Sequence, residues 1–226
     1  MVHYIPDLEG ARKQYNALGF EMRDGGKHSY GTQNIVTRLH RAYIEPICIE
    51  NWDLLREKRP QWVCDLLYPV VSEGGGAISF GVSVDNIEEF AEHLRGANIK
   101  FTLRAGSIRR ADGTTKTWQY ILLDEVPSKW NPFIIDYGVP WEERAERYGD
   151  RDQWTLSRLV IETMEPTEYG QWVARSFLRR GPRRMSRISF GLRGDLVRPL
   201  LPVKSFATSL LTKFITWVSC RCGQGT

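Results

Sequence analysis

A carboxylate inside an apolar stretch is the first residue to consider for chemistry. Glu45 follows Tyr43 and Ile44 and precedes Pro46 and Ile47. In a strand, Glu45 would share one face with Tyr43 and Ile47. Burying an ionised carboxylate among apolar neighbours is costly unless a partner or a metal ion compensates its charge. The pattern therefore indicates either a functional carboxylate in a pocket or an ordinary solvent-exposed strand face.

Further along the chain, aromatic and basic residues suit the binding of a small molecule. Trp118 and Tyr120 alternate in an apolar run, so on one face of a strand they could line a cavity, although core packing is the alternative. Arg110 precedes the turn sequence Ala111–Gly113. It could hold an anionic oxygen of a substrate, or it could belong to the turn alone.

The sequence lacks the motifs of several other classes of enzyme and binding site. No glycine-rich loop followed by Lys-Ser or Lys-Thr is present, which argues against nucleotide hydrolysis, and no serine nucleophile elbow occurs. Cys48 and Cys64 lie in apolar surroundings typical of buried thiols, and the Cys220–Cys222 motif has no second pair for zinc. With no long apolar span and no basic leader, we expect a cytoplasmic protein with neither a membrane nor a nucleic acid partner.

The elements that would position these residues form a repeat. A strand followed by a helix pattern occurs three times, with cap-like residues at Asp7, Asn86 and Glu165, each separated by 79 residues. Asp and Asn are good helix caps, and Pro166 suits a first helical turn. Strand-like runs follow the first two helices, so each of these units is predicted to be β-α-β-β-β.

The predicted boundaries follow from the turn signals between these runs. Asp24–Gly26 is expected to be a turn, so the strands after the first helix are placed at 20–23, 34–39 and 42–49, and those after the second at 100–104, 115–123 and 133–137. The expected organisation is a domain at 1–140 (module one 1–50, helical connector 51–76, module two 77–140), a linker with the start of a third βα unit at 141–180, and a basic tail at 181–226.

Charge is distributed unevenly over a chain whose formal net charge is +4. Residues 175–226 carry 11 of the 31 lysines and arginines but only one of the 27 acidic residues. This tail is interpreted as a diverged, irregular carboxyl-terminal segment. The alternative is a basic arm for nucleic acid or an acidic membrane, but interleaved aromatic residues and nucleic-acid motifs are absent.

Together these fragments resemble the glyoxalase-like branch of the vicinal-oxygen-chelate superfamily. The resemblance covers roughly residues 1–140, with a fainter echo at 155–178. The fragments that carry it are Pro6–Ala11, Leu18–Phe20, Gly26–His28, Gly31–Asn34, Tyr43–Ile47, Arg110–Gly113, Trp118 and Pro132–Tyr137.

The resemblance implies an α+β fold in which tandem βαβββ modules form a cupped mixed sheet around a small molecule. In metal-dependent relatives, a carboxylate on the fourth strand of a module binds a divalent metal, which polarises substrate oxygens as a Lewis acid. Glu45 matches this position and is the expected catalytic residue, while Asp136 is the expected counterpart in module two. For each, an exposed strand face is the alternative.

The sequence departs from the family at the other metal ligands. The position of the first-strand histidine falls one residue before Met1, and its equivalent in module two is Ser79. Gln33 stands where relatives often have a histidine. His28 could substitute as a ligand, so the predicted metal set is Glu45, Asp136 and His28, with the identity of the metal open.

Two functions remain open on this basis. One is a metal-dependent lyase, isomerase or dioxygenase acting on a small oxygenated molecule. The other is a metal-free protein of the same fold that binds or sequesters a small molecule. A homodimer is an expectation by analogy only. The predicted substrate-binding residues are Tyr43, Asn34, Arg110, Trp118 and Tyr120.

Overall fold

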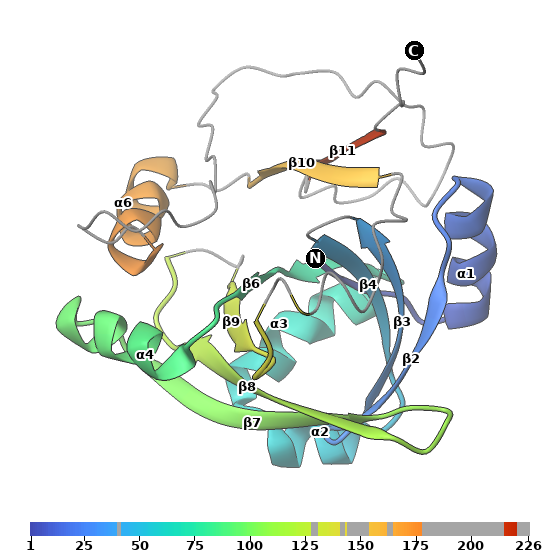
Figure 1. The fold of residues 1–226 in the computed structure, drawn as a ribbon, viewed down its shortest axis with the longest axis horizontal. Helices are drawn as coiled ribbons and strands as arrows, with labels where there is room; N and C mark the ends of the chain where they lie inside the picture. The colour runs from blue at the N-terminus through green and yellow to red at the C-terminus, as the bar shows by residue number, and fades with distance from the viewer. Residues whose placement is uncertain are drawn as a thin grey trace.

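Two βαβββ units meet edge to edge in one nine-stranded sheet of this computed structural model (Figure 1). The structure describes residues 1–39, 42–127, 131–140, 143, 154–161, 165–177 and 215–220. The first unit consists of β1 (Val2–Tyr4), α1 (Leu8–Ala17), β2 (Arg23–His28), β3 (Thr32–Leu39) and β4 (Ala42–Ile49). The second consists of β6 (Gly81–Ser83), α4 (Ile87–Gly96), β7 (Phe101–Arg109), β8 (Thr115–Leu123) and β9 (Phe133–Asp136).

The strand order curls the sheet into a nearly closed cup. The order is β5-β1-β4-β3-β2-β7-β8-β9-β6, and the two units join where β2 pairs antiparallel with β7. The short strand β5 (Gly76–Ser79) pairs with β1 at one edge, and β6 then pairs with β9 at the other. Because β5 and β6 follow one another in the chain, this short stretch connects the two edges of the sheet. The predicted α+β fold with a cupped mixed sheet is confirmed.

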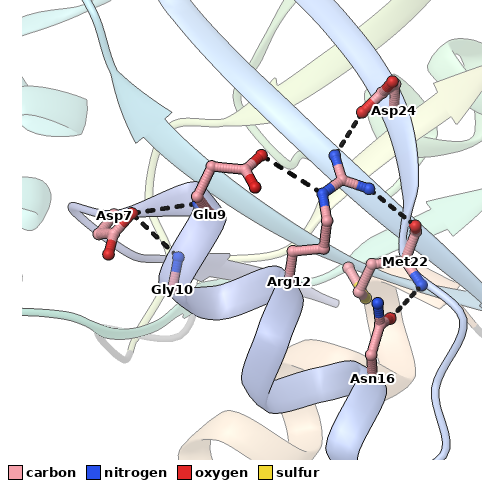
Figure 2. A network of polar contacts seen from close by, with 7 residues as sticks. All are labelled: Asp7, Glu9, Gly10, Arg12, Asn16, Met22 and Asp24. Atoms are coloured by element: carbon pink, nitrogen blue, oxygen red, sulfur yellow. Dashed lines mark hydrogen bonds and ion pairs between the residues drawn. The ribbon is translucent and has the colours of Figure 1, made fainter.

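The predicted helix caps are present at both repeats. The Asp7 carboxylate accepts hydrogen bonds from the backbone N–H groups of Glu9 (3.1 Å) and Gly10 (3.0 Å), as Figure 2 shows. The Asn86 side chain accepts one from the backbone N–H of Glu89 (3.0 Å). These bonds satisfy donors that have no partner inside the helix, which explains why each helix begins where the sequence pattern placed it.

Polar contacts also fix how α1 leads into β2 (Figure 2). Arg12 donates a hydrogen bond to the backbone oxygen of Met22 (2.8 Å) and forms an ion pair with Asp24. The Asn16 side chain accepts a hydrogen bond from the backbone N–H of Met22 (2.9 Å). One helix face therefore holds the start of the strand that later carries His28.

The prediction of a turn at Asp24–Gly26 is wrong, because β2 runs through Gly25 and Gly26. A Cβ on Gly25 would lie 1.8 Å from Asn34 Oδ1, and one on Gly26 would lie 2.2 Å from the Arg109 backbone oxygen. The pairing with β3 also shifts between Asp24 and Gly26. These glycines permit the close approach of β3 and β7 to an irregular strand, so here they mark a bulge.

Helices cover the outer face of the sheet. In the second unit, α4 contributes Phe90 and Leu94 to a core formed with Ile121, Leu123 and Ile134. The helix of the third repeat, α6 (Pro166–Phe177), adds its own side chains to the same core, namely Tyr169, Trp172, Val173 and Phe177. The third repeat therefore packs onto the second.

The connector forms two helices, α2 (Trp52–Lys58) and α3 (Gln61–Ser72). The chain leaves the helical conformation at Arg59, as is usual before a proline. Trp62 packs against the inner-face cluster of Tyr120, Leu122 and Ile135. The inner face of the cup is thus lined by strands on one side and by the connector on the other.

The third unit and the tail are described only in part. Strand β10 (Trp154–Val160) precedes α6 and pairs antiparallel with β11 (Ile215–Cys220), which lies in the basic tail. The other residues of the 181–226 tail lie outside the described residues. Among those that are described, no helix has the length and apolarity needed to cross a membrane.

Candidate functional site

Three adjacent strands bring a buried carboxylate, an amide and an imidazole together. Glu45 on β4 is only 8% exposed. Its Oε1 accepts a hydrogen bond from Asn34 Nδ2 on β3 (2.5 Å) and lies 3.6 Å from His28 Nε2 on β2. The structure therefore unites three of the predicted site residues and excludes the exposed-face alternative for Glu45.

The bulge in β2 orients the amide of this cluster. The backbone N–H of Gly26 donates a hydrogen bond to Asn34 Oδ1 (3.0 Å). Because an amide side chain has one accepting end and one donating end, this bond turns the Asn34 NH₂ group toward Glu45. The local irregularity of β2 thus sets the direction from which Glu45 receives its hydrogen bond.

His28 is held in a neutral state by its surroundings. Burial and, to a smaller extent, the positive charge of Arg59 lower its pKa to about 3, although a hydrogen bond with Thr32 acts in the opposite direction. Its Nδ1 lies 2.8 Å from Thr32 Oγ1, and its ring stacks on Tyr30 with a centroid distance of 4.8 Å. A neutral imidazole next to Glu45 can exchange hydrogen bonds without adding charge.

The pKa of Glu45 is raised above its ordinary value of 4.5. Burial is the main cause, opposed by the Asn34 hydrogen bond and by the positive charges of the Met1 amino group and Arg59. The contact between His28 and Glu45 is therefore not an ion pair, because burial disfavours the charged form of both groups. A carboxyl group with a raised pKa is suited to accept and return a proton near neutral pH.

Sequence reasoning missed Arg59, which enters the cup from the connector. Its guanidinium carbon lies 3.7 Å from the Tyr30 ring centroid, and its Nη1 donates a hydrogen bond to the Tyr120 hydroxyl (2.7 Å). Tyr30, between Arg59 and His28, was also missed. The Arg59–Pro60 sequence was the available signal, because the residue before a proline disfavours the helical conformation, and the connector is interrupted at Arg59.

The predicted aromatic residues lie on the inner face as expected. Trp118 packs with Tyr120 in the inner cluster, and its ring also contacts His28 edge-on at 5.9 Å. The Tyr43 hydroxyl lies 2.6 Å from the Tyr137 hydroxyl, which links β4 of the first unit to the end of β9 in the second. The two units therefore share one wall around Glu45.

The structure does not bring the other two predicted residues to this cluster. Asp136 accepts hydrogen bonds from the backbone N–H groups of Ile87 (3.1 Å) and Gly138 (2.7 Å), so it caps the start of α4. It is two residues from Ile134, which packs in the outer core, and therefore lies on the outer face. Arg110 lies in the β7–β8 turn, where its backbone N–H bonds to the Thr114 oxygen (2.9 Å).

Comparison with known proteins agrees with this architecture. A family model described as a glyoxalase-like domain matches residues 1–177. The chain belongs to the glyoxalase-like domain family. Its two-module cupped sheet agrees with the fold that the resemblance to the vicinal-oxygen-chelate superfamily implied. A search of curated proteins found no match.

Solved structures support the fold of this glyoxalase-like chain. A hypothetical protein from Staphylococcus aureus has a TM-score of 0.68 and 18% identity, covering 78% of this chain and 73% of its own. Methylmalonyl-CoA epimerase from Mycobacterium tuberculosis has a TM-score of 0.40, with 13% identity over 64% of this chain and 89% of its own. A mutant 4-hydroxymandelate synthase from Streptomyces coelicolor has a TM-score of 0.49, with 10% identity over 78% and 50%. Of these three, the Staphylococcus aureus protein has a TM-score above 0.5 and supports the fold.

The residues of this glyoxalase-like domain do not assemble the predicted metal set. His28 and Glu45 meet, but Asp136 caps α4. Ser79, at the family's ligand position in module two, donates its hydroxyl to the Asn131 backbone oxygen (2.6 Å). Across the described ranges, no group of three or more His, Cys, Asp or Glu side chains is arranged to hold a metal ion. A divalent metal held by three protein side chains therefore does not fit the described residues.

The low pKa of His28 predicts that the domain loses stability in acid. The folded pKa of about 3 lies below the ordinary value of 6.5, so the unfolded chain binds more protons below about pH 6.5. This contribution is complete above that pH and declines as the pH falls, by at most about 1.4 kcal/mol per pH unit. We expect His28→Gln to show a smaller loss of unfolding free energy than the wild type between about pH 7 and pH 5 in urea titrations.

His3 and Glu45 also contribute to this dependence. Burial lowers the pKa of His3 to about 4, so it adds to the acid loss with the same sign. The raised pKa of Glu45 acts in the opposite direction, because its contribution is lost as the pH rises through the folded pKa. The comparison of His28→Gln with the wild type isolates one of these groups. Equal slopes in both proteins would contradict a buried, neutral His28.

Proposed function

We propose that this glyoxalase-like protein is an enzyme that transfers a proton on a small oxygenated molecule, with Glu45 as the general base and acid. The observation that carries the proposal is the buried Glu45 carboxyl group on the inner face, with a raised pKa and a hydrogen bond of 2.5 Å from Asn34. Such a group is unusual in a core and common at sites of proton transfer.

The proposed step is the isomerisation of a carbonyl compound. The ionised Glu45 takes a proton from the carbon next to the carbonyl group, and the electron pair of the broken C–H bond moves to the carbonyl oxygen to form an enolate. In a substrate with a hydroxyl group on that carbon, the hydroxyl proton passes to the enolate oxygen. Glu45 then returns its proton to the former carbonyl carbon, and the new carbonyl group forms at the carbon that lost the proton. Asn34 fixes the direction of the carboxylate, and the inner-face aromatic residues Tyr43, Trp118 and Tyr120 exclude water and contact the substrate.

Hydrogen–deuterium exchange tests this proposal directly. The purified chain in D₂O is incubated with 2-oxobutyrate, dihydroxyacetone or methyl 2-oxobutyrate, and the loss of proton signal at the carbon next to the carbonyl is followed by NMR. We expect exchange faster than with heat-denatured protein. The same measurement after EDTA treatment, with elemental analysis of the protein, tests metal dependence. Because the described residues do not form a three-ligand site, we expect exchange to survive EDTA.

A metal-free binding protein is the second candidate. The observation that favours it is the apolar and aromatic wall formed by Trp62, Trp118, Tyr120 and Ile135. Such walls are typical of small-molecule sites. Saturable quenching of tryptophan fluorescence by a carbonyl compound, without catalysed exchange of its protons, would support this function and contradict proton transfer.

A further inference from the structure

Two buried hydrogen-bond donors near Tyr120 have no protein acceptor in the described part of the chain. Trp62 Nε1 and Arg104 Nε are buried, and neither has a hydrogen-bond partner among the described residues. Buried donors are almost always paired, since each unpaired one costs about 1–3 kcal/mol. Two of them beside the proposed catalytic face therefore require an explanation.

Both donors belong to the same part of the inner face. Arg104 on β7 lies directly opposite Tyr120 on β8, so their side chains share one face of the sheet. The Nη1 atom of Arg104 donates a hydrogen bond to the backbone oxygen of Lys58 (3.3 Å). Trp62 packs against the inner cluster that contains Tyr120. Arg59 donates to the Tyr120 hydroxyl. The strand and the connector thus bring three donor side chains around one tyrosine.

The chemistry of these groups selects the ligand. Indole and guanidinium groups donate hydrogen bonds but cannot accept them. Within the part of the chain that the structure describes, no carboxylate forms an ion pair with Arg59 or Arg104. A partner that supplies acceptor oxygens would satisfy the two unpaired donors, and negative charge on it would be attracted by both guanidinium groups. These are the properties of a carboxylate or a phosphate group.

This donor group lies close to the proposed base. Tyr30 connects the two, because its ring stacks on His28 and lies under the guanidinium of Arg59. His28 in turn lies 3.6 Å from Glu45. A ligand whose anionic end binds at Arg59 would extend along this wall toward the carboxyl group of Glu45.

We propose that Arg59, Arg104 and Trp62 form an oxyanion-binding subsite that holds the carboxylate or phosphate group of the substrate. This inference rests on the proposed function for the identity of the ligand as substrate, but the binding itself does not require catalysis. It assigns to Arg59 and Arg104 the anion contact that the sequence had suggested for Arg110.

Binding to the whole chain is measured with three probes: 2-oxobutyrate, methyl phosphate and the neutral ester methyl 2-oxobutyrate. Isothermal calorimetry gives the affinity, and the indole N–H signal of Trp62, assigned with Trp62→Phe, reports the site by ¹⁵N NMR. We expect at least one anion to bind saturably and shift the Trp62 signal, and the ester to bind at least about tenfold more weakly. The stronger anion identifies the source as carboxylate or phosphate.

Variants locate the site. Arg59→Met and Arg104→Met should each weaken anion binding by about tenfold or more, and Arg104→Lys should weaken it less because the positive charge remains. Arg95→Met is the matched control, since Arg95 is exposed and also lies beside an aromatic ring, that of Phe101. Circular dichroism confirms that each variant is folded. If the methionine variants do not fold, Arg104→Lys and the Trp62 signal still decide the result.

The outcomes separate this inference from the proposed function. Failure of both anions to shift the Trp62 signal, or equal losses in Arg95→Met and Arg59→Met, would overturn the subsite even if a neutral ketone still exchanged protons through Glu45. Conversely, Arg59-dependent anion binding with no exchange in any probe would support the subsite and contradict proton transfer.

Discussion

Replacing Glu45 with glutamine is expected to slow catalysed proton exchange by about 10²–10⁴-fold, the usual contribution of a positioned general base. Glutamine nearly preserves the shape of the side chain, and its oxygen can still accept the hydrogen bond from Asn34 Nδ2. It cannot take a proton from carbon. The rate of deuterium incorporation into the best probe, measured by NMR at saturating concentration, gives the comparison.

The matched control is Glu50→Gln, which changes the same residue type just beyond the end of the same strand. Glu50 is exposed and forms an ion pair with Lys27 (2.8 Å). Surface pairs of this kind contribute about 0–1 kcal/mol, so neither the rate nor the stability should change much. A Glu45→Gln protein that exchanges protons as fast as Glu50→Gln would refute the role of Glu45.

Truncation of Phe177 to alanine is expected to lower the free energy of unfolding by about 3–5 kcal/mol. Phe177 is the last residue of α6 and is 2% exposed. Its ring lies 6.0 Å from the rings of both Phe90 and Trp172, within the core beneath α4. Removing the ring leaves a cavity among side chains that cannot all move to fill it. Urea denaturation followed by circular dichroism measures the change.

Leu18→Ala provides the contrast for this prediction. Leu18 is 65% exposed at the end of α1, so its truncation should change stability by no more than about 0.5 kcal/mol. If Phe177→Ala also cost less than about 1 kcal/mol, α6 would not be part of the core that the structure shows. The comparison thus tests whether the third repeat supports the two-module sheet.

Local patterns were sufficient for much of the fold. The helix caps Asp7 and Asn86 act on backbone groups two or three residues away, and their 79-residue spacing marked the repeat before any contact was known. Strand β8, predicted at 115–123, has those bounds in the structure. Capping and alternation depend on near neighbours in the chain, which is why they are visible without tertiary information.

The candidate site was visible only in part. The alternation around Glu45 indicated a side chain flanked by apolar neighbours, but it left open whether that face was buried. Asp136 has a similar sequence setting and lies instead on the outer face, where it caps α4. The difference lies in which groups the fold places beside each carboxylate. For Asp136, one of them is the backbone N–H of Ile87, which is 49 residues away in the chain.

From its own pattern, the chain specifies the repeated units, their caps and the strand that carries Glu45. Tertiary structure alone decides that Gly25 and Gly26 form a bulge, that His28 and Asn34 meet Glu45, and that Arg59 reaches Tyr120 across 61 residues. The physical reason is the range of the interactions. Helix capping and strand alternation are local, whereas burial, pKa and the convergence of donors depend on which distant strands the closing sheet brings together.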